Sequence, residues 1–198
     1  MSSLLEMLAG QLGGDTTAQI SRQLGSDQAA TGKAISAALP VLMGALARNA
    51  SQKQGAESLA GALARDHDGS ILDNLSGFLQ KPETGAGEGI LGHVLGSKRV
   101  AVEQQLGQQT GLDAGSIGKL LPILAPIVMG ALGRAKRQSN LDTGGLSSML
   151  AGERKVAESA GSLGGLAALL DADRDGNITD DVAKAGMGLL GRLLRRRS

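Results

Sequence analysis

Acidic side chains alternate near the end of the sequence in a pattern that suits a hard cation. Asp171, Asp173 and Asp175 stand at every second position, and Gly176 follows them. Alternate carboxylates converge on one cation when the chain turns sharply, and glycine permits that turn. Oxygen ligands of this kind suit calcium, with magnesium as the alternative. The sequence therefore predicts a calcium site with six ligands: Asp171, Asp173, Asp175, Asn177, Thr179 and Asp181.

The loop over residues 171–182 fits the first nine positions of an EF-hand-type loop. It departs from that pattern at the twelfth position, where Val182 replaces the bidentate glutamate. Asp181 can substitute from the first turn of the following helix, which would resemble a shorter, dockerin-like calcium loop. The alternative is that these acids only cap a helix and solvate a turn, because Thr179, Asp180 and Asp181 complement a helix N-terminus.

A second acidic turn lies earlier in the chain. Residues 66–73, Asp-His-Asp-Gly-Ser-Ile-Leu-Asp, resemble residues 173–180, Asp-Arg-Asp-Gly-Asn-Ile-Thr-Asp. Asp66, Asp68 and Asp73 are candidate ligands, but Ala64 occupies the place equivalent to Asp171. We expect this turn to be a poorer cation site than the later one.

The residue types needed for catalysis are scarce. Cysteine is absent, and neither His67 nor His93 has a second histidine nearby or the spacing of a catalytic triad. Tryptophan and tyrosine are also absent, and Phe78 is the only aromatic residue, so stacking platforms for single-stranded nucleic acid are missing. We expect a protein with no catalytic residues and no small-molecule substrate.

The C-terminal segment joins leucines to a basic cluster made of Arg192, Arg195, Arg196 and Arg197. Cations at a helix C-terminus complement the helix dipole, which is the simpler interpretation. The alternative is contact with an acidic partner, anionic lipid or nucleic acid. The net charge of +1 and the lack of aromatic residues argue against nucleic acid or membrane. A protein partner or self-association is the better expectation.

Caps and apolar spacing predict helices around these motifs. Ser3 and Glu6 form a capping box, Asp15 is expected to cap a second helix that Gly25 ends, and Ser26 is expected to start a long helix. Pro40 lies within that long helix and predicts a kink. The apolar residues that share its face are Ile35, Leu39, Leu42 and Leu46.

A second long helix is predicted after Asp113, and it is apolar nearly all round. Its most apolar part, residues 119–134, is shorter than a membrane span and contains Pro122 and Pro126, so a buried core helix is expected. No window alternates apolar and polar residues as a strand would. We therefore expect an all-α fold.

The chain contains an internal similarity. Residues 40–48, Pro-Val-Leu-Met-Gly-Ala-Leu-Ala-Arg, recur as residues 126–134, Pro-Ile-Val-Met-Gly-Ala-Leu-Gly-Arg. We predict a helical bundle of two related halves, residues 1–80 and 90–198, joined by the Pro/Gly-rich residues 81–89. The two long, Pro-kinked helices are expected to pack together in one shared core.

Three stretches carry a resemblance to a known family: Gly89-Ile-Leu-Gly-His-Val-Leu-Gly96, Gln108-Gln-Thr-Gly-Leu-Asp113 and Leu124-Ala-Pro-Ile-Val-Met-Gly-Ala-Leu-Gly133. They resemble the YidB-like bacterial family, a domain of unknown function (937). The resemblance implies a helical fold with no established activity. The first six residues lack a basic secretory region, so a cytoplasmic location is expected. We expect a non-enzymatic interaction or scaffold protein with a calcium loop; the alternative is a protein that binds nucleic acid or an anionic membrane surface through its basic C-terminal tail.

Overall fold

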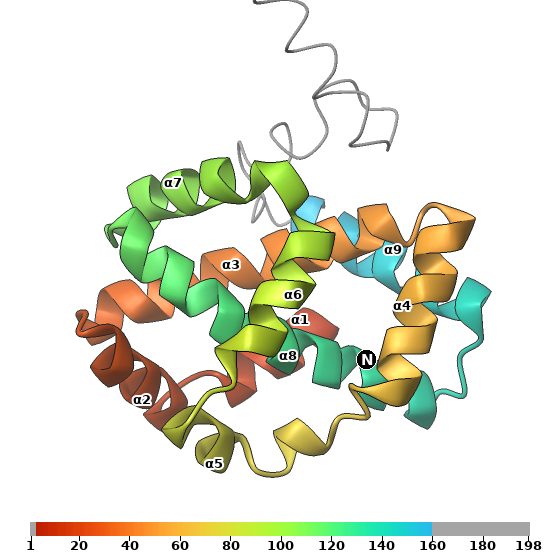
Figure 1. The fold of residues 1–198 in the computed structure, drawn as a ribbon, viewed down its shortest axis with the longest axis horizontal. Helices are drawn as coiled ribbons and strands as arrows, with labels where there is room; N and C mark the ends of the chain where they lie inside the picture. Colours follow the sequence, from red (N-terminus) through yellow and green to blue (C-terminus); the bar gives the residue numbers. More distant parts are fainter. Residues whose placement is uncertain (1–2, 160–198) are drawn as a thin grey trace, which may run out of the picture.

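The computed structural model describes residues 3–159, and this part of the chain is all-α, as predicted, with no strand (Figure 1). The helices are α1 (Leu4–Gln11), α2 (Asp15–Leu24), α3 (Gln28–Asn49), α4 (Lys53–Arg65), α5 (Leu75–Gln80), α6 (Thr84–Val94), α7 (Arg99–Thr110), α8 (Ala114–Gln138) and α9 (Thr143–Ser159). Two short 3₁₀ helices, η1 (Ser70–Leu72) and η2 (Gly96–Lys98), lie in the connections.

Local capping explains where α1 and α8 begin. The Ser3 hydroxyl accepts a hydrogen bond from the Glu6 N–H at 3.1 Å, and the Glu6 carboxylate accepts one from the Ser3 N–H at 3.0 Å. This is the predicted capping box. At α8, the Asp113 carboxylate accepts from the Ser116 N–H at 3.0 Å. A short polar side chain thus satisfies an amide that the helix itself leaves unpaired.

Two predicted caps are wrong by one residue. Asp15 is the first residue of α2 rather than its cap, because Gly14, with φ of +55°, makes the turn into the helix. Ser26 does not start α3, because its N–H donates to the Ser21 carbonyl at 3.0 Å and so closes α2 after Gly25. Asp27 caps α3 instead.

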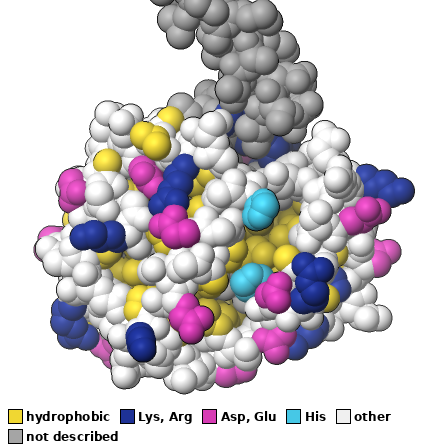
Figure 2. Space-filling model, viewed as in Figure 1, with side chains coloured by type: hydrophobic (Ala, Val, Ile, Leu, Met, Phe, Trp, Pro, Cys, Tyr) yellow, Lys and Arg dark blue, Asp and Glu magenta, His cyan; other side chains and the backbone are white. Residues whose placement is uncertain are grey.

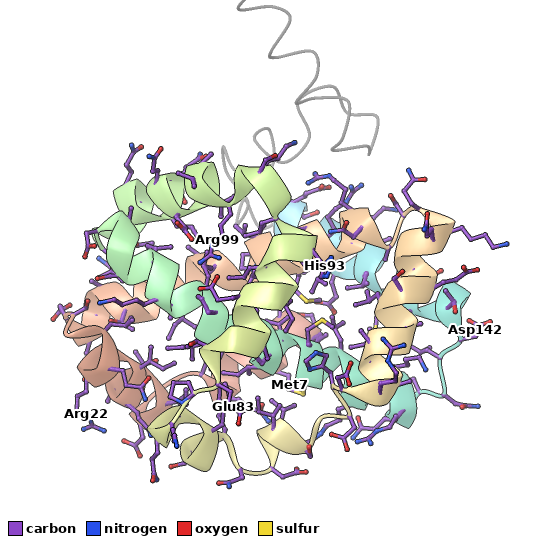
Figure 3. All side chains as sticks on the ribbon, in the orientation of Figure 1. Met7, Arg22, Glu83, His93, Arg99 and Asp142 are labelled. Atoms are coloured by element: carbon purple, nitrogen blue, oxygen red, sulfur yellow. The ribbon has the colours of Figure 1, made fainter. Side chains whose placement is uncertain are left out.

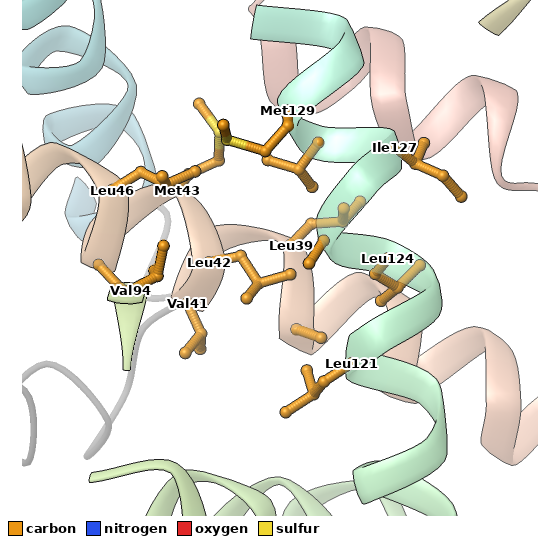
Figure 4. Close-up of a cluster of buried hydrophobic side chains, with 14 of the residues drawn as sticks. Leu39, Val41, Leu42, Met43, Leu46, Val94, Leu121, Leu124, Ile127 and Met129 are labelled. Atoms are coloured by element: carbon orange, nitrogen blue, oxygen red, sulfur yellow. The ribbon is translucent and has the colours of Figure 1, made fainter. Parts of the chain in front are cut away.

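The helices α3 and α8 form the centre of the molecule. They contact each other, and their aliphatic side chains belong to one continuous hydrophobic core, as predicted (Figure 4). Pro40, Pro122 and Pro126 are all buried within these helices. Burying such side chains is the main source of folding free energy in a protein with almost no aromatic residues.

Both core helices are long and apolar enough to cross a membrane by length and composition alone. Most of each lies inside the protein: 67% of the apolar window of α3 and 83% of that of α8 are buried. Burial of this extent is typical of core helices in a folded domain. The two helices therefore do not decide where the protein is located.

The Pro/Gly-rich stretch predicted as a joint is largely helical. Only Lys81–Glu83 are irregular, and α6 begins at Thr84. Gly87 is buried, and a methyl group there would overlap the carbonyl oxygen of Pro122. The glycine thus allows α6 to cross α8 closely, which explains why a glycine-rich segment forms a packed helix.

Candidate functional site

A groove lies between α4 and α6, and α3 and α8 form its base. Its volume is about 740 Å³. The base and walls carry apolar side chains: Leu46, Leu59, Ile90, Val94 and Met129. Polar side chains stand along its margin: Asn49, Ser58, Arg65, Asp66, His67 and His93. Figure 2 shows the apolar base open to solvent between the two histidines. We refer to this feature as the α4–α6 groove.

Small residues create the hollow. Gly55 and Ala62 line the groove from α4, and Ala86 and Gly89 line it from α6. A Cβ atom at Gly89 would meet no atom within 4 Å, so this glycine borders open space. Gly55 has a different role, because a methyl group there would overlap the carbonyl oxygen of Asn49. Gly55 lets α4 start close to α3, whereas Gly89 leaves the groove unfilled.

The margin of the groove offers hydrogen-bonding groups. His93 projects from α6 into the space between α6 and α4 (Figure 3). Burial lowers the pKa of His67, although the neighbouring Asp66 carboxylate acts in the opposite direction. His67 is therefore neutral at pH 7 and can both donate and accept a hydrogen bond.

Two further contacts set the shape of the margin. Asn49 donates from Nδ2 to the carbonyl oxygens of Ala45 and Val94 at 3.1 and 3.2 Å, which ties α3 to the end of α6. The exposed Arg65 and Asp66 side chains lie 3.9 Å apart, an ion pair in solvent that contributes little to stability. The α6 wall is thus anchored to the core.

The first acidic turn, residues 66–73, borders the same groove, and its carboxylates have local partners. The Asp68 carboxylate accepts from the Ser70 N–H at 2.9 Å, and hydrogen bonds from Ser70 are the main cause of its lowered pKa. Asp73 pairs with Arg134. Among the residues that the structure describes, no group of three or more His, Asp or Glu side chains is placed to hold a metal ion. Asp66, Asp68 and Asp73 are therefore not brought together as a cation site.

The other predicted site residues fall beyond the described part of the chain. The calcium ligands Asp171, Asp173, Asp175, Asn177, Thr179 and Asp181 lie outside the described residues, as do the tail arginines Arg192, Arg195, Arg196 and Arg197. Both predictions rest on the sequence.

The α4–α6 groove is not predicted by the sequence. The available signal is the recurrence of small residues in residues 84–89, within the Pro/Gly-rich stretch 81–89 that is predicted as a joint between the two halves. On a helix, Gly85 and Gly89 are four residues apart and lie on one face. A face of small residues on a packed helix leaves space beside it, but only the placement of α4 shows that the space becomes a groove.

Comparison with known proteins gives a family and no activity. No curated protein and no solved structure matches the chain. A family model described as "Bacterial protein of unknown function (DUF937)" matches residues 6–135, from α1 to near the end of α8. The match covers both core helices and both walls of the α4–α6 groove. The chain belongs to this bacterial family of unknown function.

Proposed function

We propose that this protein is a non-enzymatic interaction protein that binds an amphipathic helix of a protein partner in the α4–α6 groove. The observation that carries the proposal is the groove itself: an apolar base between two helices, with hydrogen-bonding side chains along its margin. An amphipathic helix that lays its apolar face into a groove is a common mode of peptide recognition. Aliphatic side chains spaced three and four residues apart would contact the base.

The form of the groove favours a helix over a small ligand. Pockets for small molecules usually enclose most of the ligand surface. This groove leaves one side in solvent, which suits a helix whose polar face stays hydrated. The methionine at position 129 adds an adaptable surface, because its unbranched side chain repacks easily around different partners.

The test uses a labelled 18-residue peptide with leucines on one helical face, and a scrambled peptide of the same composition. Fluorescence anisotropy measures binding to the full chain. We expect the helical peptide to bind and the scrambled peptide to bind at least about tenfold more weakly, because only the first presents a continuous apolar face. Equal binding of the two peptides would contradict the proposal.

Two glycine variants on α6 show whether binding uses this groove. Gly89→Leu places a side chain in the groove without overlapping another atom. Gly92→Leu adds the same side chain at an exposed position of α6 that does not line the groove and also has open space. We expect only Gly89→Leu to abolish binding. Unchanged binding of the helical peptide by Gly89→Leu would refute the proposal. Dodecanol serves as a small apolar ligand for comparison, and a protein that binds dodecanol but not the helical peptide would also refute it.

The alternate acids of residues 171–181 support a second part of the proposal, a calcium site at the loop. Isothermal titration of calcium into the chelator-treated full chain tests it. We expect the heat of binding to be lost in Asp171→Ala/Asp175→Ala and kept in the matched variant Asp66→Ala/Asp68→Ala, whose carboxylates have local partners. No heat above dilution at millimolar calcium would rule the site out.

A further inference from the structure

A second, smaller pocket adjoins the α4–α6 groove at the C-terminal end of α4. Its volume is about 180 Å³, and it shares Asp66, His67 and Ala86 with the groove. It lies between the first acidic turn, α5, the start of α6 and α8. Its other walls are apolar and are made of Ile71, Phe78 and Pro126, and Asp68 and Glu83 add carboxylates at its margin. We refer to this feature as the Phe78 pocket.

The size of the Phe78 pocket suits one side chain rather than a separate small molecule. Pockets for drug-sized ligands usually measure about 300–1,000 Å³. The Phe78 pocket is smaller than that range, and it shares residues with the groove. A side chain near one end of a helix bound in the groove can therefore enter the pocket. The pocket is an extension of the proposed binding site.

One carboxylate of the Phe78 pocket lacks a compensating charge. Asp66 lies 3.9 Å from Arg65, and Asp68 lies 3.6 Å from Arg137, so each of these acids has an arginine beside it. Glu83 stands in the connection between α5 and α6 and is exposed (Figure 3). Within residues 3–159, no partner lies within ion-pair distance of the Glu83 carboxylate. The pocket therefore has a local negative charge at pH 7.

The walls of the pocket match the chemistry of a basic side chain. Lysine and arginine have an apolar stem and a cationic head. The stem can pack on the apolar wall at Ile71, and a cation beside the aromatic ring of Phe78 is attracted to its face. The head can then pair with Glu83. An acidic side chain would be repelled by Glu83, and a neutral one would leave that carboxylate without a counter-charge.

We propose that the Phe78 pocket binds a lysine or arginine side chain of the partner, so that the α4–α6 groove selects amphipathic helices with a basic residue at one end of their apolar face. This inference rests on the proposed function, because it assigns the specificity of the same groove. The apolar base provides contact area for any amphipathic helix, and the pocket distinguishes between such helices by charge.

The test compares three versions of the helical peptide, which carry lysine, glutamine or glutamate at both ends of the leucine face. Fluorescence anisotropy measures their binding to the full chain at low salt. We expect the lysine version to bind at least about fivefold more tightly than the glutamine version, and the glutamate version to bind more weakly than both. The net charge of the chain is +1, so attraction by the protein as a whole would favour the glutamate version instead.

The outcomes separate this inference from the proposed function. Equal affinities of the lysine and glutamine versions would overturn the inference and leave helix binding in the groove intact. Absence of binding by all three versions would refute the proposed function, and the inference with it.

Two glutamate variants show whether the preference for lysine comes from the Phe78 pocket. Glu83→Gln removes the carboxylate at an exposed position. Glu57→Gln is the matched control, because Glu57 is exposed on α4 and lines neither the groove nor the pocket. We expect only Glu83→Gln to lose the preference, with its affinity for the glutamine version unchanged. A preference that persists in Glu83→Gln would contradict the assignment.

Carbodiimide coupling locates the basic side chain directly. The reagent joins a lysine amine to a neighbouring carboxylate as an amide, and the carbodiimide takes up the water that is lost and becomes a urea. Mass spectrometry of the complex with the lysine version identifies the carboxylate that has reacted. We expect coupling at Glu83 to exceed coupling at Glu57 at least about fivefold, because binding raises the local concentration of the amine at the pocket. Equal coupling at the two positions would overturn the inference.

Discussion

Gly133 lies where the backbone of the first acidic turn crosses α8. A methyl group at Gly133 would overlap the carbonyl oxygen of His67, which is backbone and has little room to move. We expect Gly133→Ala to lower the free energy of unfolding by about 1–3 kcal/mol, the usual cost of overpacking. Urea denaturation measures the change.

The matched control for this substitution is Gly92→Ala. Gly92 is exposed on α6 and has no neighbouring atom to meet a new methyl group. Alanine there is expected to raise stability by up to about 1 kcal/mol through its higher helix propensity. Equal effects of the two substitutions would show that the close approach at Gly133 is not what constrains the position.

His67 gives the stability a dependence on pH. Its pKa is lowered in the folded protein by burial, so the unfolded chain binds the proton more readily. The free energy of unfolding therefore falls as the pH drops through and below the ordinary histidine pKa, about 6.5. We expect the melting temperatures measured at pH 7.5 and at pH 5.5 to differ less for His67→Gln than for the natural chain. An identical pH dependence in the two proteins would exclude this role of His67.

The N-terminus of α1 is capped in part by a side chain of α9. The Glu153 carboxylate of α9 accepts hydrogen bonds from the Leu4 and Leu5 N–H groups of α1 at 2.9 and 3.2 Å. A carboxylate at a helix N-terminus satisfies unpaired amides and complements the helix dipole. A side chain from 148 residues further along the chain thus adds to the cap that Ser3 provides locally.

We expect Glu153→Ala to loosen α1 at a cost of about 1 kcal/mol, the usual magnitude for a lost N-terminal cap. Amide hydrogen exchange should rise in α1 and stay unchanged in the centre of α8. Glu158→Ala is the control, because Glu158 forms an ion pair at 3.4 Å with the partly exposed Arg154 on its own helix. Unaltered exchange in α1 would show that the Ser3 cap is sufficient.

For the whole molecule, the shared core predicts a single unfolding transition. Side chains of α3 and α8 belong to one hydrophobic cluster, so neither half of the chain has a complete core of its own. We expect residues 1–85 and 86–198, expressed separately, to show less helix than the intact chain and no cooperative melt at its temperature. Circular dichroism on heating measures both. Independent cooperative melting of each half at the temperature of the whole chain would refute the shared core.

Features that depend on local chemistry could be predicted from the sequence. The absence of strand patterns predicted an all-α fold, the Ser3–Glu6 box predicted the start of α1, and the all-round apolar character near Leu120 predicted a buried helix. These features follow from residues close together in the chain, so a short window of sequence contains their cause.

The roles of the glycines of α6, and the pairing of polar groups from distant elements, follow from how the helices pack. Gly87 and Gly89 are the same residue type two positions apart, yet Gly87 packs against Pro122 and Gly89 borders an open groove. Likewise, Arg134 became the partner of Asp73 because α8 passes beside the first acidic turn. Such roles depend on elements far apart in the sequence, and their contacts exist only after the core helices α3 and α8 have packed.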